Sequence, residues 1–180
     1  WEPSIDRVCA ENVGAYDPND KQGFPLGYGS DHRIRPGQQL EYLIRFQNTG
    51  TDTAFTVQVR DTLSPWLDPG TLRAGAASHP YTWSLSSSGV LSFKFDNIML
   101  PDSNVNLSGS QGFVSFQIGQ RAGVPLETQI LNSAAIYFDF NEPVITNQTL
   151  HTVGIDYITA VQDAWGEETT PTIGVQPNPA

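Results

Sequence analysis

A lysine, a carboxylic acid and an asparagine in this sequence have the types and positions needed for a covalent reaction between side chains. Asp61 continues the apolar alternation of residues 55–59, and Asn132 lies inside the apolar pattern of residues 130–134. Both polar side chains are therefore expected inside the protein, where a carboxylate or an amide needs a partner. Lys21, one of only two lysines in the chain, is the best candidate for that partner and lies just before the first predicted strand.

Burial would make these three side chains reactive. An apolar environment favours the neutral amine of Lys21 and the protonated carboxyl of Asp61, so the amine becomes a nucleophile and the acid polarises the carbonyl of Asn132. Attack on Asn132 with loss of ammonia would leave a permanent isopeptide bond. The alternative is that Asp61 and Asn132 form ordinary hydrogen bonds and Lys21 lies at the surface. Lys94, on the outward face of its strand, is expected to be solvated.

Turn segments rich in Asp and Asn suggest a second site, for calcium. Calcium prefers six to eight oxygen ligands, and the motifs DPND and FDFN could supply some of them. The alternative is that these residues only form turns, in which their side chains bond their own backbone. The candidate ligands are Asp17, Asn19, Asp20, Asp139 and Asn141.

Conventional catalytic motifs are absent from the sequence. It contains no GxSxG elbow, no HExxH and no glycine-rich phosphate loop, and its three histidines have no metal-ligand spacing. We interpret His32, His79 and His151 as turn or surface residues. Tyr81 and Trp83 lie on an alternating face, which favours core packing over a platform for sugar binding. We therefore expect a protein that is not an enzyme and has no cofactor except, in the alternative above, calcium.

The elements that must position these residues are short β-strands. Apolar and polar residues alternate in six segments, whereas amphipathic helical periodicity is almost absent before residue 154. Seven to nine strands joined by turn residues predict an all-β fold, an immunoglobulin-like antiparallel β-sandwich, with an antiparallel barrel as the alternative. The alternating segments are 40–47, 55–60, 81–83, 91–95, 114–118 and 130–138.

Composition limits the partners and the environment of the chain. The formal net charge of −10 excludes nucleic acid as a partner, because phosphate binding needs clustered Lys and Arg. Cys9 is the only cysteine, so no disulfide can form within the chain, and a pairing of Cys9 outside it stays open. No stretch approaches the roughly 20 apolar residues of a membrane helix, and the first residues do not resemble a signal peptide. We expect no membrane insertion and export signals elsewhere in a longer protein.

Several separated motifs, read together, resemble a known kind of domain. It is found near the C-termini of large secreted and surface proteins of Bacteroidota and is related to immunoglobulin-like conserved-repeat surface domains. The resemblance covers roughly residues 14–153. The motifs are DPNDK (17–21), LEYLIRFQNTGTDTAFTVQVRDTLSPWLD (40–68), MLPDS (99–103), GFVSF (112–116) and NSAAIYFDFN (132–141).

The resemblance implies a role and a chemistry. Such domains act as stalks, spacers or adhesive segments, and some relatives carry a Lys-to-Asn isopeptide bond, a pattern that falls on Lys21, Asp61 and Asn132. In these bacteria Asp-Thr followed by a small or apolar residue resembles an O-glycosylation signal, which makes Thr53 a candidate. The second match, at Thr62, would be unusable if Asp61 is buried.

The end of the sequence carries a further resemblance. IGVQPNPA (173–180) resembles the start of the C-terminal sorting domain of the type IX secretion system. The expected organisation is a linker from a preceding domain (1–16), a β-sandwich domain (17–154), a second linker (155–172) and the start of the sorting domain (173–180). The resemblance implies an extracellular or cell-surface location, with the secretion machinery and the neighbouring domains of the same protein as partners.

Three functions remain open on the sequence. The leading hypothesis is a non-catalytic structural module of an exported protein. The second is a calcium-braced binding module for a glycan or for a neighbouring protomer in a surface filament. The third is an accessory domain of a hydrolase whose catalytic part lies upstream of Trp1.

Overall fold

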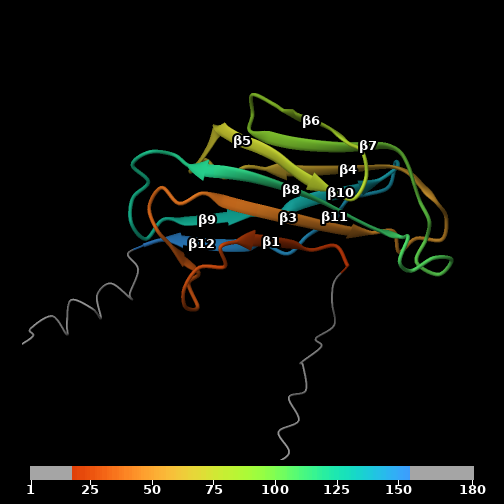
Figure 1. Cartoon of the computed structure of the whole chain (residues 1–180), viewed down its shortest axis with the longest axis horizontal. Helices are drawn as coiled ribbons and strands as arrows, with labels where there is room; N and C mark the ends of the chain where they lie inside the picture. Colours follow the sequence, from red (N-terminus) through yellow and green to blue (C-terminus); the bar gives the residue numbers. More distant parts are fainter. Residues whose placement is uncertain (1–17, 155–180) are drawn as a thin grey trace, which may run out of the picture.

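β-strands are the regular secondary structure of the described part of the chain, and loops and turns join them. The computed structural model describes residues 18–154, which contain twelve strands and no helix (Figure 1). The predicted linkers, the start of the sorting domain, Cys9 and Asp17 lie outside the described residues. Within residues 18–154, no helix could span a membrane.

One layer of the molecule is a four-stranded antiparallel sheet in the order β1-β3-β8-β5. In Figure 1 this sheet lies in front, with β1 at its lower edge. The register pairs Lys21 with Ile44 between β1 and β3, and Tyr42 with Phe116 between β3 and β8. The strands are β1 (Lys21–Phe24), β3 (Leu40–Gln47), β5 (Leu67–Ala77) and β8 (Gln111–Gln120).

The other layer contains a five-stranded sheet in the order β11-β10-β4-β7-β6 and a three-stranded sheet in the order β2-β12-β9. Only Ser133 separates β9 from β10, so the chain changes its neighbour there from β12 to β4. The strands are β2 (Arg33–Ile34), β4 (Ala54–Thr62), β6 (Thr82–Leu85), β7 (Val90–Leu100), β9 (Gln129–Asn132), β10 (Ala134–Phe138), β11 (Val144–Ile145) and β12 (Thr149–Val153).

The apolar core lies between the two layers. Aromatic rings meet across it: Phe46 of β3 is 5.3 Å from Phe95 of β7, and Phe116 of β8 is 5.9 Å from Phe93 of β7. The predicted sandwich is therefore confirmed, and the barrel alternative is not what forms. The inward faces predicted from alternation are fully buried, as at Leu40, Tyr42, Ile44, Phe46, Val57, Val59, Val114, Phe116, Ile118, Ile130 and Ile136.

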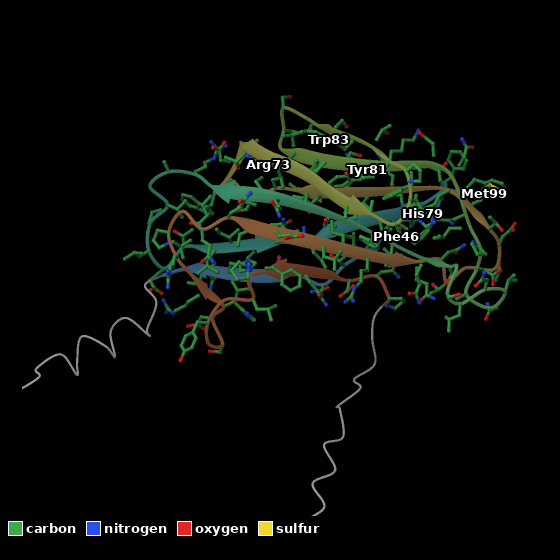
Figure 2. The ribbon with its side chains drawn as sticks, in the orientation of Figure 1. Phe46, Arg73, His79, Tyr81, Trp83 and Met99 are labelled. Atoms are coloured by element: carbon green, nitrogen blue, oxygen red, sulfur yellow. The ribbon has the colours of Figure 1, made fainter. Side chains whose placement is uncertain are left out.

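Two predicted core residues lie at the surface instead. Phe55 is 55% exposed because a bulge between Ala54 and Thr56 shifts the alternation, so Ala54 is buried in its place. Trp83 is 48% exposed on the edge strand β6, whereas Tyr81 packs on Phe93 as predicted (Figure 2). An edge strand has a neighbour on one side only, which leaves a large ring there partly uncovered.

Candidate functional site

Lys21 enters the core from the edge strand β1. The sequence prediction placed it just before the first strand, but β1 begins on it. The burial pattern of β1 alternates, so Lys21 and Gly23 face inward beside Ile44 and Tyr42 of β3. The Lys21 side chain is fully buried, although lysine is among the residues most rarely buried without a partner. The alternative of a surface Lys21 is therefore wrong.

Asn147 holds the backbone of Lys21 in place. The Lys21 N–H donates to Oδ1 of Asn147 at 2.8 Å, and Nδ2 of Asn147 donates to the Lys21 carbonyl at 2.9 Å. One side-chain amide thus satisfies both backbone groups on the outer edge of β1, as a neighbouring strand would. This contact ties β1 to the segment that leads into β12.

Asp61 and Asn132 reach the same place from the other layer. Asp61 of β4 lies opposite Ala134 of β10, and Asn132 lies two residues before Ala134 on the same face. Diagonal neighbours of this kind in a sheet are within reach of each other's side chains. Both are buried, Asp61 completely, as strand parity predicts.

The structure brings the lysine and the acid into direct contact. Nζ of Lys21 donates a hydrogen bond to Oδ2 of Asp61, and both side chains have no exposed surface. Nζ also lies 4.6 Å from the centre of the Tyr42 ring and 5.5 Å from that of Phe116. The amine is therefore enclosed by one carboxyl group and two aromatic rings.

Burial pushes this pair toward its neutral form. Loss of solvent lowers the pKa of Lys21, and the neighbouring Asp61 charge opposes the change. Loss of solvent also raises the pKa of Asp61, against the opposing effects of Lys21 and, more weakly, Asn132. In both residues desolvation is the larger effect, so burial shifts the pair toward a free amine and a protonated acid.

Asn132 lies close enough to Asp61 to act on its pKa, but its amide atoms do not reach the geometry of a full hydrogen bond. Within residues 18–154, neither Oδ1 nor Nδ2 of Asn132 has a hydrogen-bond partner, and neither does Oδ1 of Asp61. Buried polar atoms are almost always paired, so several unpaired ones in one place need an explanation. A nucleophile, an acid and an amide carbonyl in one enclosed space can carry out amide exchange.

Three residues that line this site were not identified from the sequence. Tyr42 contacts Lys21, and Thr149 lies opposite Asn132 in the register of β12 and β9. His151 follows on the same face of β12 and packs edge-on against Tyr42 at 6.1 Å. His151 was interpreted as a turn or surface residue, which is wrong, since it is 1% exposed. Its alternation with Thr149 and Val153 was the available signal.

Three of the predicted calcium ligands, Asn19, Asp20 and Asp139, use their side chains to bind other parts of the protein. Asp20 binds the Arg45 guanidinium, with Oδ1 2.7 Å from Nε. Oδ1 of Asn19 accepts the backbone N–H of Gln47 at 3.1 Å.

On the second predicted calcium motif, Asp139 accepts the backbone N–H groups of Phe55 and Thr56 at 2.9 and 2.7 Å, and Asn141 lies in the turn after β10. Residues 18–154 contain no group of three or more His, Cys, Asp or Glu side chains arranged for a metal. The calcium site stays a prediction, and these contacts match its alternative, in which the residues form turns.

The glycosylation candidate lies in a loop. Thr53 precedes β4, and its backbone N–H donates to the side chain of Asp52 at 2.7 Å. Glycosylation of Thr53 stays a prediction. The second glycosylation motif begins at Asp61, and the sequence predicts that Thr62 is unusable if Asp61 is buried. Asp61 is fully buried.

Comparison with solved structures finds a similar fold in a bacterial pilin subunit. The chain is similar to BcpA, the major pilin subunit of Bacillus cereus, with 17% identity, a TM-score of 0.53 and coverage of 74% of this chain and 39% of BcpA. A variant of BcpA gives a TM-score of 0.54 at 16% identity, with the same coverage. A collagen-binding domain from a Staphylococcus aureus adhesin is 10% identical, with a TM-score of 0.45 over 79% of this chain and 100% of that domain.

Sequence comparison places the chain in a family. No curated protein sequence matches it. A family model does match residues 17–152, which include Lys21, Asp61 and Asn132. The chain therefore belongs to the family described as "Domain of unknown function (DUF7619)".

Proposed function

We propose that this domain is a non-catalytic structural module, a stalk, spacer or adhesive segment of an exported extracellular or cell-surface protein, and that an isopeptide bond between Lys21 and Asn132 braces it. One observation carries the proposal. The Lys21–Asp61 pair is fully buried beside an asparagine whose amide has no hydrogen-bond partner within residues 18–154. Such a pair is costly to bury and is weak evidence for stability by itself, so a chemical role is the better explanation.

The reaction needs no group from outside the protein. Lys21 passes a proton to Asp61, and the free amine attacks Cγ of Asn132 while the Asp61 carboxyl polarises the Asn132 carbonyl. The bond between Nζ and Cγ forms, and the bond between Cγ and Nδ2 breaks. Nδ2 leaves as ammonia with a proton that Nζ gives up through Asp61. Asp61 ends with the proton that it took from Lys21, and no oxidant or reductant is consumed.

The position of the bond suits a module under load. Within residues 18–154, β1 is the first strand and lies at the edge of its sheet, where it pairs with β3. Asn132 belongs to β9, which pairs with β12, the last strand of the part of the chain that the structure describes. A bond between Lys21 and Asn132 therefore links the first strand to the neighbour of the last. Tension applied at the two ends would pass through a covalent link rather than peel β1 away.

Comparison and sequence support the setting of this role. The fold is similar to that of a major pilin subunit, which supports a load-bearing surface function and contact with neighbouring domains or protomers. The resemblance of residues 173–180 to a sorting-domain start supports export through a type IX system in a member of the Bacteroidota. These residues lie outside the described part of the chain.

The intact mass of the denatured protein tests the bond. We expect wild type to be lighter than its sequence by one ammonia molecule, Lys21→Ala to have its full mass, and Lys94→Ala, the control at the other lysine, to show the wild-type deficit. Tandem mass spectrometry should find a branched peptide joining Lys21 to Asn132. A wild-type protein of full mass would refute the proposal, and loss of one water would instead place the bond between Lys21 and Asp61.

A second candidate function, binding, is favoured by exposed aromatic residues. Phe55 is 55% exposed and Phe140 is 105% exposed, and together with Lys94 they line a surface pocket of about 730 Å³. Exposed rings of this kind can stack on the apolar faces of sugars. If this function holds, a Phe55→Ala/Phe140→Ala double variant should lose binding on a glycan array while Leu107→Ala, at an exposed residue elsewhere, retains it. Wild type that binds no glycan would exclude it.

A further inference from the structure

The wall of the Lys21 pocket contains a hydroxyl group that the reaction above does not use. Tyr42 of β3 is fully buried, and its ring lies over Nζ of Lys21. The same ring packs against Phe116 at 5.2 Å and against His151 at 6.1 Å, so its position is fixed from two sides. Within residues 18–154 its hydroxyl has no hydrogen-bond partner, which is unusual for a buried tyrosine.

Strand register places Tyr42 near Asn132. Tyr42 packs against His151, which lies two residues from Thr149 on β12, and Thr149 lies opposite Asn132. The pKa of Tyr42 is raised well above its ordinary value, first by burial and then by the charge of Asp61, while the side chains of Asn132 and Thr149 act in the opposite direction. The phenol therefore keeps its proton at every physiological pH and lies next to Asn132 and Thr149. A protonated phenol is a hydrogen-bond donor.

The other polar side chains around Asn132 already use their protons in other hydrogen bonds or in the proton transfer of the reaction. The Thr149 hydroxyl donates its one proton to the backbone carbonyl of Asn132 at 3.1 Å. Nε2 of His151 lies 3.0 Å from the carbonyl of Pro25, so Nε2 carries the proton and Nδ1 can only accept. Asp61 has to move protons between Nζ and the leaving nitrogen. The Tyr42 hydroxyl is thus the proton donor in this group that no other contact uses.

We propose that the Tyr42 hydroxyl donates a hydrogen bond to Oδ1 of Asn132 as Lys21 attacks, which makes Tyr42 a catalytic residue of isopeptide formation. The inference rests on the proposed function. Attack on Cγ places negative charge on Oδ1, and a donor fixed in a water-free site stabilises that charge strongly. Tyr42 thus shares the polarisation of the Asn132 carbonyl that the reaction above assigns to Asp61, and Asp61 takes the proton from Nζ and delivers it to Nδ2. Tyr42 returns to its starting state, with its proton, when ammonia leaves.

The test deletes one oxygen atom and follows the rate of bond formation. Wild type, Tyr42→Phe and Tyr81→Phe are made by cell-free synthesis, quenched in denaturant at intervals and weighed intact. Tyr42→Phe keeps the ring over Lys21 and should lose ammonia about 100-fold more slowly than wild type, the typical effect of removing one such donor. Tyr81→Phe is the control at another tyrosine, because the Tyr81 hydroxyl donates to the Gly75 carbonyl at 2.7 Å at the surface, away from Lys21.

A catalytic role of Tyr42 is distinguished from a purely structural one by measuring stability in a protein that cannot form the bond. Tyr42→Phe and its parent are compared by thermal unfolding in an Asn132→Ala background, where no bond can form. A slow reaction with little change in thermal midpoint supports catalysis. Tyr42→Phe reacting at the wild-type rate, or slowed only as far as folding is impaired, would overturn this inference and leave the proposed function intact. Wild type of full mass would remove both.

A second measurement covers the case in which Tyr42→Phe does not fold. Replacing tyrosine by 3-fluorotyrosine makes the phenol a stronger donor and keeps every ring in place. Bond formation should then be faster than in the unlabelled protein. A rate that is unchanged or slower would overturn the role of Tyr42, whereas the ammonia deficit at the end of the reaction would still report on the bond itself.

Discussion

The two lysines of this chain both lie beside an aspartate, in opposite environments. Lys21 and Asp61 have no exposed side-chain surface, whereas Lys94 and Asp96 are 51% and 52% exposed with a contact of 2.8 Å. The exposed pair is solvated as the sequence predicts, and such pairs contribute about 0–1 kcal/mol to stability. In the buried pair, removal of water shifts both pKa values toward the neutral forms. The same two residue types thus form an inert surface contact in one place and a nucleophile with its acid in the other.

Strand geometry produces this difference. Lys94 and Asp96 are two residues apart on the outward face of β7, where Phe93 and Phe95 point into the core. Lys21 is on the inward face of β1, and Asp61 comes from the opposite layer. A local pair along one strand stays in water, while a pair contributed by two layers is covered by both. Position relative to the core, and not residue identity, decides which lysine can react.

Replacing each lysine should give the largest contrast between the two regions. Lys21→Ala leaves the Asp61 carboxyl buried without its partner and also removes the proposed bond. Breaking the buried pair alone should lower the free energy of unfolding by about 3–5 kcal/mol, and loss of the bond adds to this. Lys94→Ala should change the free energy of unfolding by no more than about 0.5 kcal/mol. Urea unfolding followed by circular dichroism measures both values.

Asn132→Ala, measured by the same urea unfolding, separates the contribution of the buried Lys21–Asp61 pair from that of the proposed cross-link. This variant keeps the Lys21–Asp61 pair and loses only the cross-link, so it should be destabilised less than Lys21→Ala. A cross-link closing a loop of about 100 residues contributes about 4.7 kcal/mol in the chain-entropy model. Equal, small effects for Lys21→Ala and Lys94→Ala would contradict the contrast between the buried and exposed pairs.

Alternation explains why so much of the site could be predicted from the sequence. A period of two assigns each side chain to a face, and it correctly placed Asp61 and Asn132 inside. It failed at Phe55, because a bulge adds a residue that no local pattern reveals. The fold class followed from many segments together, so one shifted segment did not affect it.

The contacts that complete the site could not be predicted, because they join distant parts of the chain. The Asn147 clamp on Lys21 depends on how the segment before β12 passes β1. The change of partner at Ser133, which sets Asn132 beside Asp61, depends on the pairing of three strands. Tyr42 follows the core alternation of β3 and is indistinguishable there from an ordinary core residue until Lys21 is placed over its ring.

Two histidines repeat the contrast between inside and outside on a smaller scale. His151 is buried beside Tyr42, and within residues 18–154 its Nδ1 has no partner. His79 lies in a bend at the surface and is only partly buried, with Nδ1 2.8 Å from the Ser78 hydroxyl (Figure 2). Burial lowers the pKa of His151 from 6.5, helped by His32 and opposed by the hydrogen bond to Pro25.

The lowered pKa of His151 predicts that the folded protein loses stability as the pH falls. Because the folded state binds the His151 proton more weakly than the unfolded state, stability is fully present above about pH 6.5 and falls as the pH drops toward the lowered pKa. The slope cannot exceed about 1.4 kcal/mol per pH unit for one proton. Urea unfolding between about pH 8 and about pH 5 should therefore show a smaller loss of stability in His151→Gln than in wild type. His79→Gln should retain the wild-type loss. An equal loss in all three proteins would mean that His151 is protonated as easily in the folded core as in the unfolded chain, and the distinction between the buried and the surface histidine would fail.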